Sequence, residues 1–301
     1  MSSRETVLAW VESPLQLIGA AEWASAHDRP VPIAGRLTTQ MSETADELIA
    51  RGALFGVTEP YLGIPWKLLS QHDHWLVGDG FSGQFRLALT VLRPKTLTFL
   101  DDGASTLAFS RALTGEGPYA RPGVHEGRMT STLAPFALER ALRLAAARRV
   151  TLFTAFDLPE RDALARRGVA VNRHRFEWTR ETAPEARDLG HRIVMGSARP
   201  VDGRMPLDGY LHWVARVAAS GPVLYLPHRR EPHAQLDAVR AIAGVAVSEA
   251  RLPAELVLAG ASGPLDIFTL PSSAATTLPL VLDGARYTLR TEPARTQGVS
   301  S

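Results

Sequence analysis

The sequence alternates between strand-like and helical runs, and the alternation starts again after a polar stretch near the middle of the chain. That stretch, residues 176–190, contains Pro184 and has weak apolar periodicity, so we expect a linker there. Alternating strands and helices are typical of α/β proteins with parallel sheets. We therefore expect two doubly wound, Rossmann-like domains, 1–185 and 190–301, that face each other across a cleft.

The expected elements are short. Strands are predicted for 6–11, 31–35, 74–78, 96–100 and 150–156 before the linker, and for 191–197, 222–228 and 266–271 after it. Helices are predicted for 14–26, 42–56, about 135–149, 207–221, 233–244 and a last one that begins at Ser272. Ser13 as N-cap and Pro14 at the first helical position mark the start of the first helix.

Composition narrows the class of protein. The chain of 301 residues is 45% hydrophobic, enough for a substantial core, and it has no Cys, which excludes disulfides, thiolate metal sites and a cysteine nucleophile. No apolar run approaches the roughly 20 residues of a membrane-spanning helix, and Glu12 and Pro14 interrupt the N-terminal apolar patch before it could act as a signal peptide. We expect a cytoplasmic protein.

Charge gives a weaker indication. The 33 basic and 31 acidic residues nearly balance, and the basic residues are almost all Arg. Arg140, Arg143, Arg148 and Arg149 could contact anionic lipid at the inner membrane surface, but a solvated helix face is the simpler interpretation. A nucleic-acid-binding protein should instead show a continuous stripe of Arg with interleaved aromatic residues. The arginines here are scattered, so we predict no nucleic-acid partner.

Three polar groups follow predicted strands directly. In doubly wound sheets, ligands bind beyond the carboxyl ends of the strands, so these groups are candidates for a functional site. They are Asp101-Asp102-Gly103, the sequence PHRRE at 227–231, and SSAATT at 272–277.

The last two groups suit an anion. Ser272 and Ser273 open a predicted helix, where hydroxyls and unpaired backbone N–H groups of the first turn can bind a phosphate. Either serine could instead simply cap the helix. His228 at the end of a neighbouring strand favours the phosphate interpretation, because a histidine and a helix N-terminus together can neutralise a departing phosphate. A histidine packed in a loop for structural reasons is the alternative.

These motifs resemble those of bacterial sialyltransferases and polysialyltransferases. That family shares an acid-acid-Gly triplet, a His-Pro type loop and a Ser-Ser pair, which correspond here to Asp101-Asp102-Gly103, Pro227–Glu231 and Ser272-Ser273. The stretches ESPLQLIGA, GDGFS, VMGSA and LPAEL are also similar to the family, in the same order along the chain. One departure is Arg229, which stands where many members have Pro.

The resemblance implies a GT-B fold and an inverting transfer of a nonulosonic sugar, such as sialic acid, from a CMP-activated donor to an acceptor hydroxyl. By position in the triplet, Asp102 corresponds to the catalytic base that accepts the hydroxyl proton. We expect Asp101 to raise the basicity of Asp102 by like-charge repulsion, and Gly103 to let the loop pass close to the substrate.

The resemblance also implies the remaining site residues. His228, with Pro227 beside it, Ser272 and Ser273 would stabilise the leaving phosphate, and Glu255 would bind the ribose hydroxyls, although a solvated helix residue is the alternative. The set is completed by Gly196 and Ser197 near the cytosine or phosphate, and by Ser13, Gln16 and Asp79 on the acceptor side.

Metal binding and other donors remain as alternatives. Adjacent aspartates such as Asp101-Asp102 can hold Mg²⁺ or Mn²⁺ against a diphosphate. A monophosphate that has a histidine and a helix N-terminus needs no ion, so we predict no metal and no cofactor other than the donor substrate. The alternatives are a GT-B transferase that uses a UDP- or GDP-sugar, and a non-catalytic nucleotide- or nucleic-acid-binding protein. The acceptor is predicted to be a glycan or glycolipid.

Overall fold

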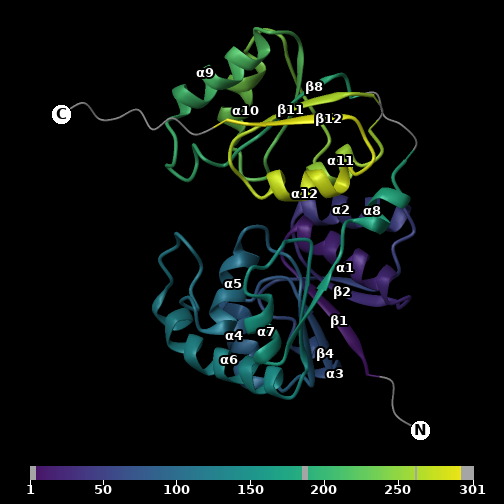
Figure 1. Ribbon diagram of the computed structural model, residues 1–301, viewed down its shortest axis with the longest axis vertical. Coiled ribbons are helices and arrows are strands. Elements are labelled where there is room, and N and C mark those ends of the chain that lie inside the picture. Colours follow the sequence, from purple (N-terminus) through teal and green to yellow (C-terminus); the bar gives the residue numbers. More distant parts are fainter. Residues whose placement is uncertain (1–4, 185–188, 262, 293–301) are drawn as a thin grey trace, which may run out of the picture. The chain divides into compact units, whose positions relative to one another are not determined.

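The computed structural model describes residues 5–184, 189–261 and 263–292. The chain divides into two compact units, Met1–Thr182 and Ala183–Ser301, which Figure 1 colours along the sequence. The division falls inside the polar stretch 176–190. No helix in the described ranges is long and apolar enough to cross a membrane.

The first unit is built on a seven-stranded parallel sheet with the order β3-β2-β1-β4-β5-β6-β7. Its strands are β1 (Val7–Val11), β2 (Val31–Arg36), β3 (Phe55–Tyr61), β4 (His74–Val77), β5 (Thr96–Phe99), β6 (Val150–Thr154) and β7 (Val169–Arg173). From β1 the chain adds β2 and β3 on one side, and then adds β4 to β7 on the other side, so the strand order reverses between β1 and β4. In doubly wound sheets this switch point is where ligands bind.

Helices cover both faces of this sheet. They are α1 (Pro14–Ala26), α2 (Thr39–Ala50), α3 (Trp66–Gln71), α4 (Gly83–Val91), α5 (Ser105–Thr114), α6 (Arg128–Ala146), α7 (Arg161–Arg166) and α8 (Glu177–Glu181). All five residues of β1 are buried, as expected for a strand with helices on both faces. Leu8 and Trp10 belong to the large core cluster on one face, so the alternate residues of β1 face the other side.

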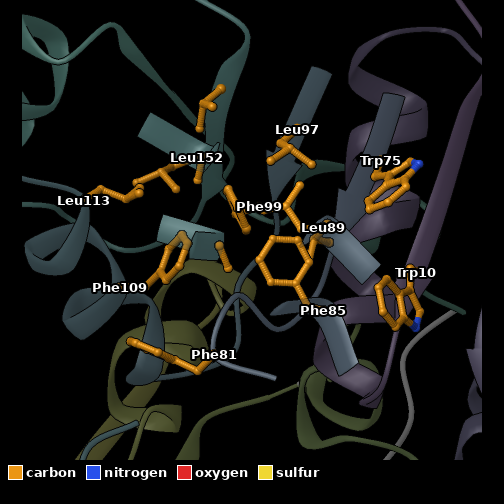
Figure 2. Packing of buried hydrophobic residues seen from close by; sticks show 14 of the residues in the cluster. Trp10, Trp75, Phe81, Phe85, Leu89, Leu97, Phe99, Phe109, Leu113 and Leu152 are labelled. Carbon is orange, nitrogen blue, oxygen red and sulfur yellow. The ribbon is translucent and has the colours of Figure 1, made fainter. Parts of the chain in front are cut away.

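Aromatic side chains fill the larger core of the first unit. Figure 2 shows Phe85 of α4, Phe99 of β5 and Phe109 of α5 packed together. The Phe99 and Phe109 ring centroids lie 4.5 Å apart, and Phe85 meets Phe99 edge to face at 5.5 Å. This packing fixes the end of β5, after which the chain continues into Asp101-Asp102.

The second unit has a five-stranded parallel sheet with the order β10-β9-β8-β11-β12. Its strands are β8 (Arg192–Met195), β9 (Val223–Leu226), β10 (Val245–Val247), β11 (Leu265–Thr269) and β12 (Tyr287–Thr291), and its helices are α9 (Leu207–Ala218), α10 (His233–Arg240), α11 (Ala254–Leu258) and α12 (Ala274–Val281). One core cluster joins α9 and α10 to the sheet, and another joins α11 and α12 to it. The switch point of this sheet lies between β8 and β11.

Several sequence predictions need correction. The predicted helix over 42–56 is wrong at its end, because α2 stops at Ala50 and the edge strand β3 begins at Phe55. The long helix begins at Arg128, so Pro135 lies inside it. Part of the expected linker is helical, since α8 occupies Glu177–Glu181. The last helix begins at Ala274, with Ser273 as its N-cap. Other elements were not predicted: α3, α4, α5, α7, α11, β7, β10 and β12.

Candidate functional site

In the first unit, polar side chains gather at the carboxyl ends of β1, β4 and β5. Glu12 follows β1, Asp79 follows β4 by two residues, and Asp102 lies three residues after the end of β5. Since β4 pairs with both β1 and β5, these three carboxylates lie at one edge of the sheet, beside its switch point.

Asp102 is held by two partners. Its Oδ1 accepts a hydrogen bond from Gln16 Nε2 at 2.8 Å, and its Oδ2 lies 3.1 Å from Arg121 Nη1. Thr106 Oγ1 accepts a hydrogen bond from the Asp102 backbone N–H at 3.0 Å, which fixes the main chain at the start of α5. The side chain keeps 18% of its surface exposed. The carboxylate is therefore oriented and still accessible.

Gln16 links the first strand to this carboxylate. It is almost fully buried on α1, and its Oε1 accepts the Glu12 backbone N–H at 2.6 Å while its amide donates to Asp102. Gly78 packs directly against it, because a Cβ at position 78 would lie 2.0 Å from Gln16 Oε1. Gln16 is therefore a buried residue that bridges the end of β1 and Asp102 by hydrogen bonds, and not an ordinary surface residue.

Asp79 and Glu12 are the other two carboxylates at this edge of the sheet, beside Asp102. Asp79 forms an ion pair with Arg121 Nη2, and its Oδ1 accepts the Phe81 N–H at 2.9 Å. Burial, with the nearby Asp102 carboxylate as the next cause, raises the pKa of Asp79 to about 7. Burial also raises the pKa of Glu12. Arg121 thus pairs with both Asp79 and Asp102, whereas Glu12 pairs with Arg36 at 3.4 Å. Burial favours the protonated form of Asp79 and Glu12.

Asp101 does not share the partners of Asp102. It is buried, and its carboxylate accepts hydrogen bonds from Thr154 Oγ1 at 2.5 Å and from the Ala155 N–H at 2.6 Å. These partners belong to the end of β6, so Asp101 ties β5 to β6. Gly103 follows in the left-handed region with φ of +60°, a conformation that favours glycine. The expected effect of Asp101 on the basicity of Asp102 stays a prediction.

Ser13 is also at this edge. It is buried as the N-cap of α1, its carbonyl accepts the Leu17 N–H at 3.1 Å, and its side chain forms no capping hydrogen bond. The acceptor-side role of Ser13 stays a prediction.

In the second unit, the loop after β9 is organised by a glutamate. Glu231 accepts hydrogen bonds from the Ser197 N–H at 2.8 Å and from the His228 N–H at 3.2 Å. Tyr225 donates its hydroxyl to the same carboxylate at 2.6 Å. Glu231 therefore joins the loop after β9 to the end of β8. Glu231 belongs to the sequence group PHRRE, in which the sequence alone assigns it no role.

His228 is mostly buried in this loop. Burial, aided by Arg229 and Arg230, lowers the pKa of His228 to about 4, so the ring is neutral at pH 7. Its Nδ1 accepts the Arg230 N–H at 3.2 Å, which leaves the proton of the neutral ring on Nε2. His228 can thus donate a hydrogen bond from Nε2, whereas we had expected it to help neutralise charge. A phosphate placed beside it would raise its pKa again.

Gly196 and Ser197 stand between the two phosphate-site candidates in the sheet order, because β8 pairs with both β9 and β11. A Cβ at Gly196 would lie 2.5 Å from the His228 backbone nitrogen, so glycine permits this close approach. Pro227, half-buried, connects the end of β9 to His228.

Ser272 and Ser273 lie directly before α12, although the predicted helix began at Ser272. Ser273 is the N-cap residue, but its side chain makes no capping hydrogen bond, and Ser272 is exposed. The simple capping interpretation thus gains no support. Glu255 on α11 is buried and accepts a hydrogen bond from Thr277 Oγ1 of α12 at 2.7 Å, so it is not the solvated helix residue that was the alternative.

One cluster of metal-ligand type is present in the described ranges, and it does not include Asp102. It consists of Glu22, His174 and Glu177, whose ligand atoms lie within 4.8 Å of one another. Sequence reasoning gave no signal for this cluster or for Arg121, which comes from the irregular segment between α5 and α6.

The fold is similar to those of solved glycosyltransferases. A structure of UDP-glucose: anthocyanidin 3-O-glucosyltransferase in complex with UDP matches with a TM-score of 0.51 at 12% identity, over 96% of this chain and 81% of that chain. Phytolacca americana UGT2, complexed with UDP-2-fluoro-glucose and pterostilbene, matches with a TM-score of 0.48 at 13% identity, over 98% and 82%. The E. coli heptosyltransferase WaaC with ADP-2-deoxy-2-fluoro-heptose matches with a TM-score of 0.42 at 10% identity, over 96% of this chain and 92% of that chain.

The first of these matches, together with the two parallel sheets, shows a fold of the GT-B type, and the predicted fold class is confirmed. No protein-family model matches the chain, and a search of curated proteins found no similar sequence.

Proposed function

We propose that this protein is an inverting glycosyltransferase that moves a nonulosonic sugar, such as sialic acid, from a CMP-activated donor to an acceptor hydroxyl. The GT-B fold is compatible with transfer from a nucleotide-activated sugar. The choice of a CMP donor rests on the resemblance of Asp101-Asp102-Gly103, the loop at 227–231 and Ser272-Ser273 to the bacterial sialyltransferase motifs.

The observation that carries the proposal is the position of Asp102. A general base must be oriented toward its substrate and must remain accessible to the hydroxyl whose proton it takes. Asp102 meets both requirements, because Gln16 and Arg121 hold its two oxygens and part of the side chain stays exposed beside the switch point. We assign Arg121 as a positioning residue that acts through Asp102.

The second unit would bind the donor. His228 can donate from Nε2, Ser273 has a hydroxyl that is not used for capping, and the positive end of the α12 dipole lies at Ala274. These are the groups that a departing monophosphate needs. Glu255, fixed by Thr277, would accept hydrogen bonds from the ribose hydroxyls, and Gly196 and Ser197 would lie near the cytosine or phosphate.

The two units would then bind different substrates. The proposal gives residues 1–185 the acceptor and the base, and residues 190–301 the nucleotide sugar. Ser13, Gln16 and Asp79 belong to the acceptor side, where Gln16 and Asp79 contribute through Asp102 and Arg121. We propose a glycan or glycolipid acceptor and a cytoplasmic location, at the inner membrane surface if the acceptor is a lipid. Transfer would need no metal, because a monophosphate leaves.

Nucleotide binding tests the donor side. Calorimetric titration with CMP, UDP, GDP and ADP should give the tightest binding for CMP. His228→Ala and the double change Ser272→Ala and Ser273→Ala should each weaken CMP binding by at least about tenfold, since each removes hydrogen-bond donors to a charged group. Ser131→Ala, at an exposed serine of α6, is the matched control and should change nothing.

Two results would contradict this assignment. Unchanged CMP affinity in both variants would remove the phosphate site from His228 and the serines. Stronger binding of UDP or GDP than of CMP would favour the alternative, a GT-B transferase that uses a UDP- or GDP-sugar.

A further inference from the structure

Three ligand-type side chains come together in the first unit, apart from Asp102. Glu22 lies on α1, His174 follows β7 directly, and Glu177 opens α8, which packs against α1 (Figure 1). One ligand atom of each residue lies within 4.8 Å of the others. Glu22 and the segment that follows β7 are more than 150 positions apart in the sequence. Any bond between them therefore closes a long loop.

His174 is the unusual member. Its side chain is only 4% exposed, and neither ring nitrogen has a hydrogen-bond partner. The ring stacks on Phe153 with centroids 4.8 Å apart and meets Phe176 edge-on at 5.0 Å. Nε2 lies 3.5 Å from Asp101 Oδ2, too far for a good hydrogen bond. A buried imidazole with two unpaired nitrogens calls for a ligand, because buried polar atoms are nearly always paired.

Glu22 is already oriented as a ligand would be. Its carboxylate accepts the backbone N–H groups of Trp178 at 3.2 Å and of Thr179 at 2.8 Å, and Thr179 also donates its hydroxyl at 2.6 Å. Hydrogen bonds of this kind hold ligating carboxylates in place in metal sites. Glu177 is exposed, which gives an ion a route from solvent.

We propose that Glu22, His174 and Glu177 bind a divalent transition-metal ion such as Zn²⁺. One imidazole nitrogen and two carboxylate oxygens are a donor set that zinc accepts, with remaining positions for water. The ion would tie α1 to the segment after β7 and so stabilise the first unit. Asp102, His228 and the serines are not among its ligands, so the proposal stands independently of the transfer reaction.

Zinc titration of the full chain tests the site. The protein is first stripped with a chelator and desalted, and then titrated with ZnCl₂ by calorimetry. We expect one ion per chain and, at a zinc concentration about 100-fold above Kd, a melting temperature higher by roughly 5–10 °C. Glu177→Gln should weaken zinc binding at least about tenfold without unfolding the protein, because this side chain is exposed. Glu181→Gln, an exposed glutamate one turn further along α8, is the matched control and should bind zinc like the parent.

Absence of zinc binding by the parent would overturn the proposal, as would binding that Glu177→Gln leaves unchanged. A melting temperature that falls on Glu177→Gln but does not respond to zinc would mean that Glu177 stabilises the fold without a metal ion. That result would also overturn the metal site.

Discussion

Replacing Gly78 with alanine should damage the candidate site through one identifiable contact. A Cβ at Gly78 would lie 2.0 Å from Gln16 Oε1, 2.3 Å from its Cδ and 2.8 Å from its Cγ. Real carbon atoms cannot approach this closely, so Gln16 must move. Gln16 is 1% exposed and is bonded at both ends of its amide, to Glu12 N–H and to Asp102. The movement therefore breaks both hydrogen bonds.

The size of the effect follows from two costs. Overpacking a well-filled site costs about 1–3 kcal/mol, and a buried amide that loses its partners costs about 1–3 kcal/mol more. Together, Gly78→Ala should lower the free energy of unfolding of the first unit by about 2–6 kcal/mol. At about 3 °C per kcal/mol for a unit of this size, that corresponds to a melting temperature lower by roughly 6–18 °C.

A double-mutant cycle makes the test specific. Gln16→Ala removes all three atoms that the new Cβ would meet, so in that background Gly78→Ala should cost less than about 1 kcal/mol in a denaturant titration. Gly209→Ala is the control, because its Cβ would meet Met205 Cε at an ordinary 3.8 Å. If Gly78→Ala costs the same with and without the Gln16 side chain, the proposed packing of this site is wrong.

Three further predictions concern the charged residues of the site and the absence of a metal requirement. The raised pKa of Asp79, about 7 against 3.8, gives a contribution to stability that is fully present below pH 3.8 and is lost as the pH rises through about 7. Asp79→Asn should therefore flatten the fall of the melting temperature between about pH 4 and 7, and an unchanged slope would contradict the shift. Arg121→Gln should lower turnover on the order of 10²-fold by releasing Asp102, while the donor KM stays nearly constant; a change confined to KM would assign Arg121 to binding. A chelator should leave transfer unchanged at a temperature well below the melting temperature of the zinc-free protein, and complete loss of activity there that Mn²⁺ restores would contradict metal-free transfer.

Buried strands could be predicted from the sequence because both of their faces are apolar. The run that forms β1 is apolar throughout, those of β4 and β5 contain only His74 and two threonines besides apolar residues, and the polar residues after the three strands mark the carboxyl edge of the sheet. The candidates Asp102, His228 and Ser273 could be found in this way, since each follows a strand in the chain order that a doubly wound sheet imposes.

Edges and loops gave no such signal. In β3, five of the seven residues are exposed, and one of them is Pro60. Exposed residues and a proline are typical of an edge strand, but in the sequence the same pattern is also typical of a loop. Arg121 reaches Asp79 and Asp102 from an irregular segment, and such segments follow no residue pattern. The different surroundings of Asp101 and Asp102 could not be predicted either, because Thr154 and Arg121 approach them from distant parts of the chain.

The most direct test of the proposed function is turnover by Asp102→Asn with a CMP-activated sialic acid, measured as transfer or as slow hydrolysis of the donor. Asparagine keeps an oxygen that can accept from Gln16 but cannot take a proton. Turnover should fall by about 10²–10⁴-fold, with CMP binding and the melting temperature nearly unchanged. Asp101→Asn should reduce turnover less and stability more, since its carboxylate is buried against Thr154 and Ala155. Equal turnover of Asp102→Asn and the parent, at equal stability, would contradict the assignment of Asp102 as the base.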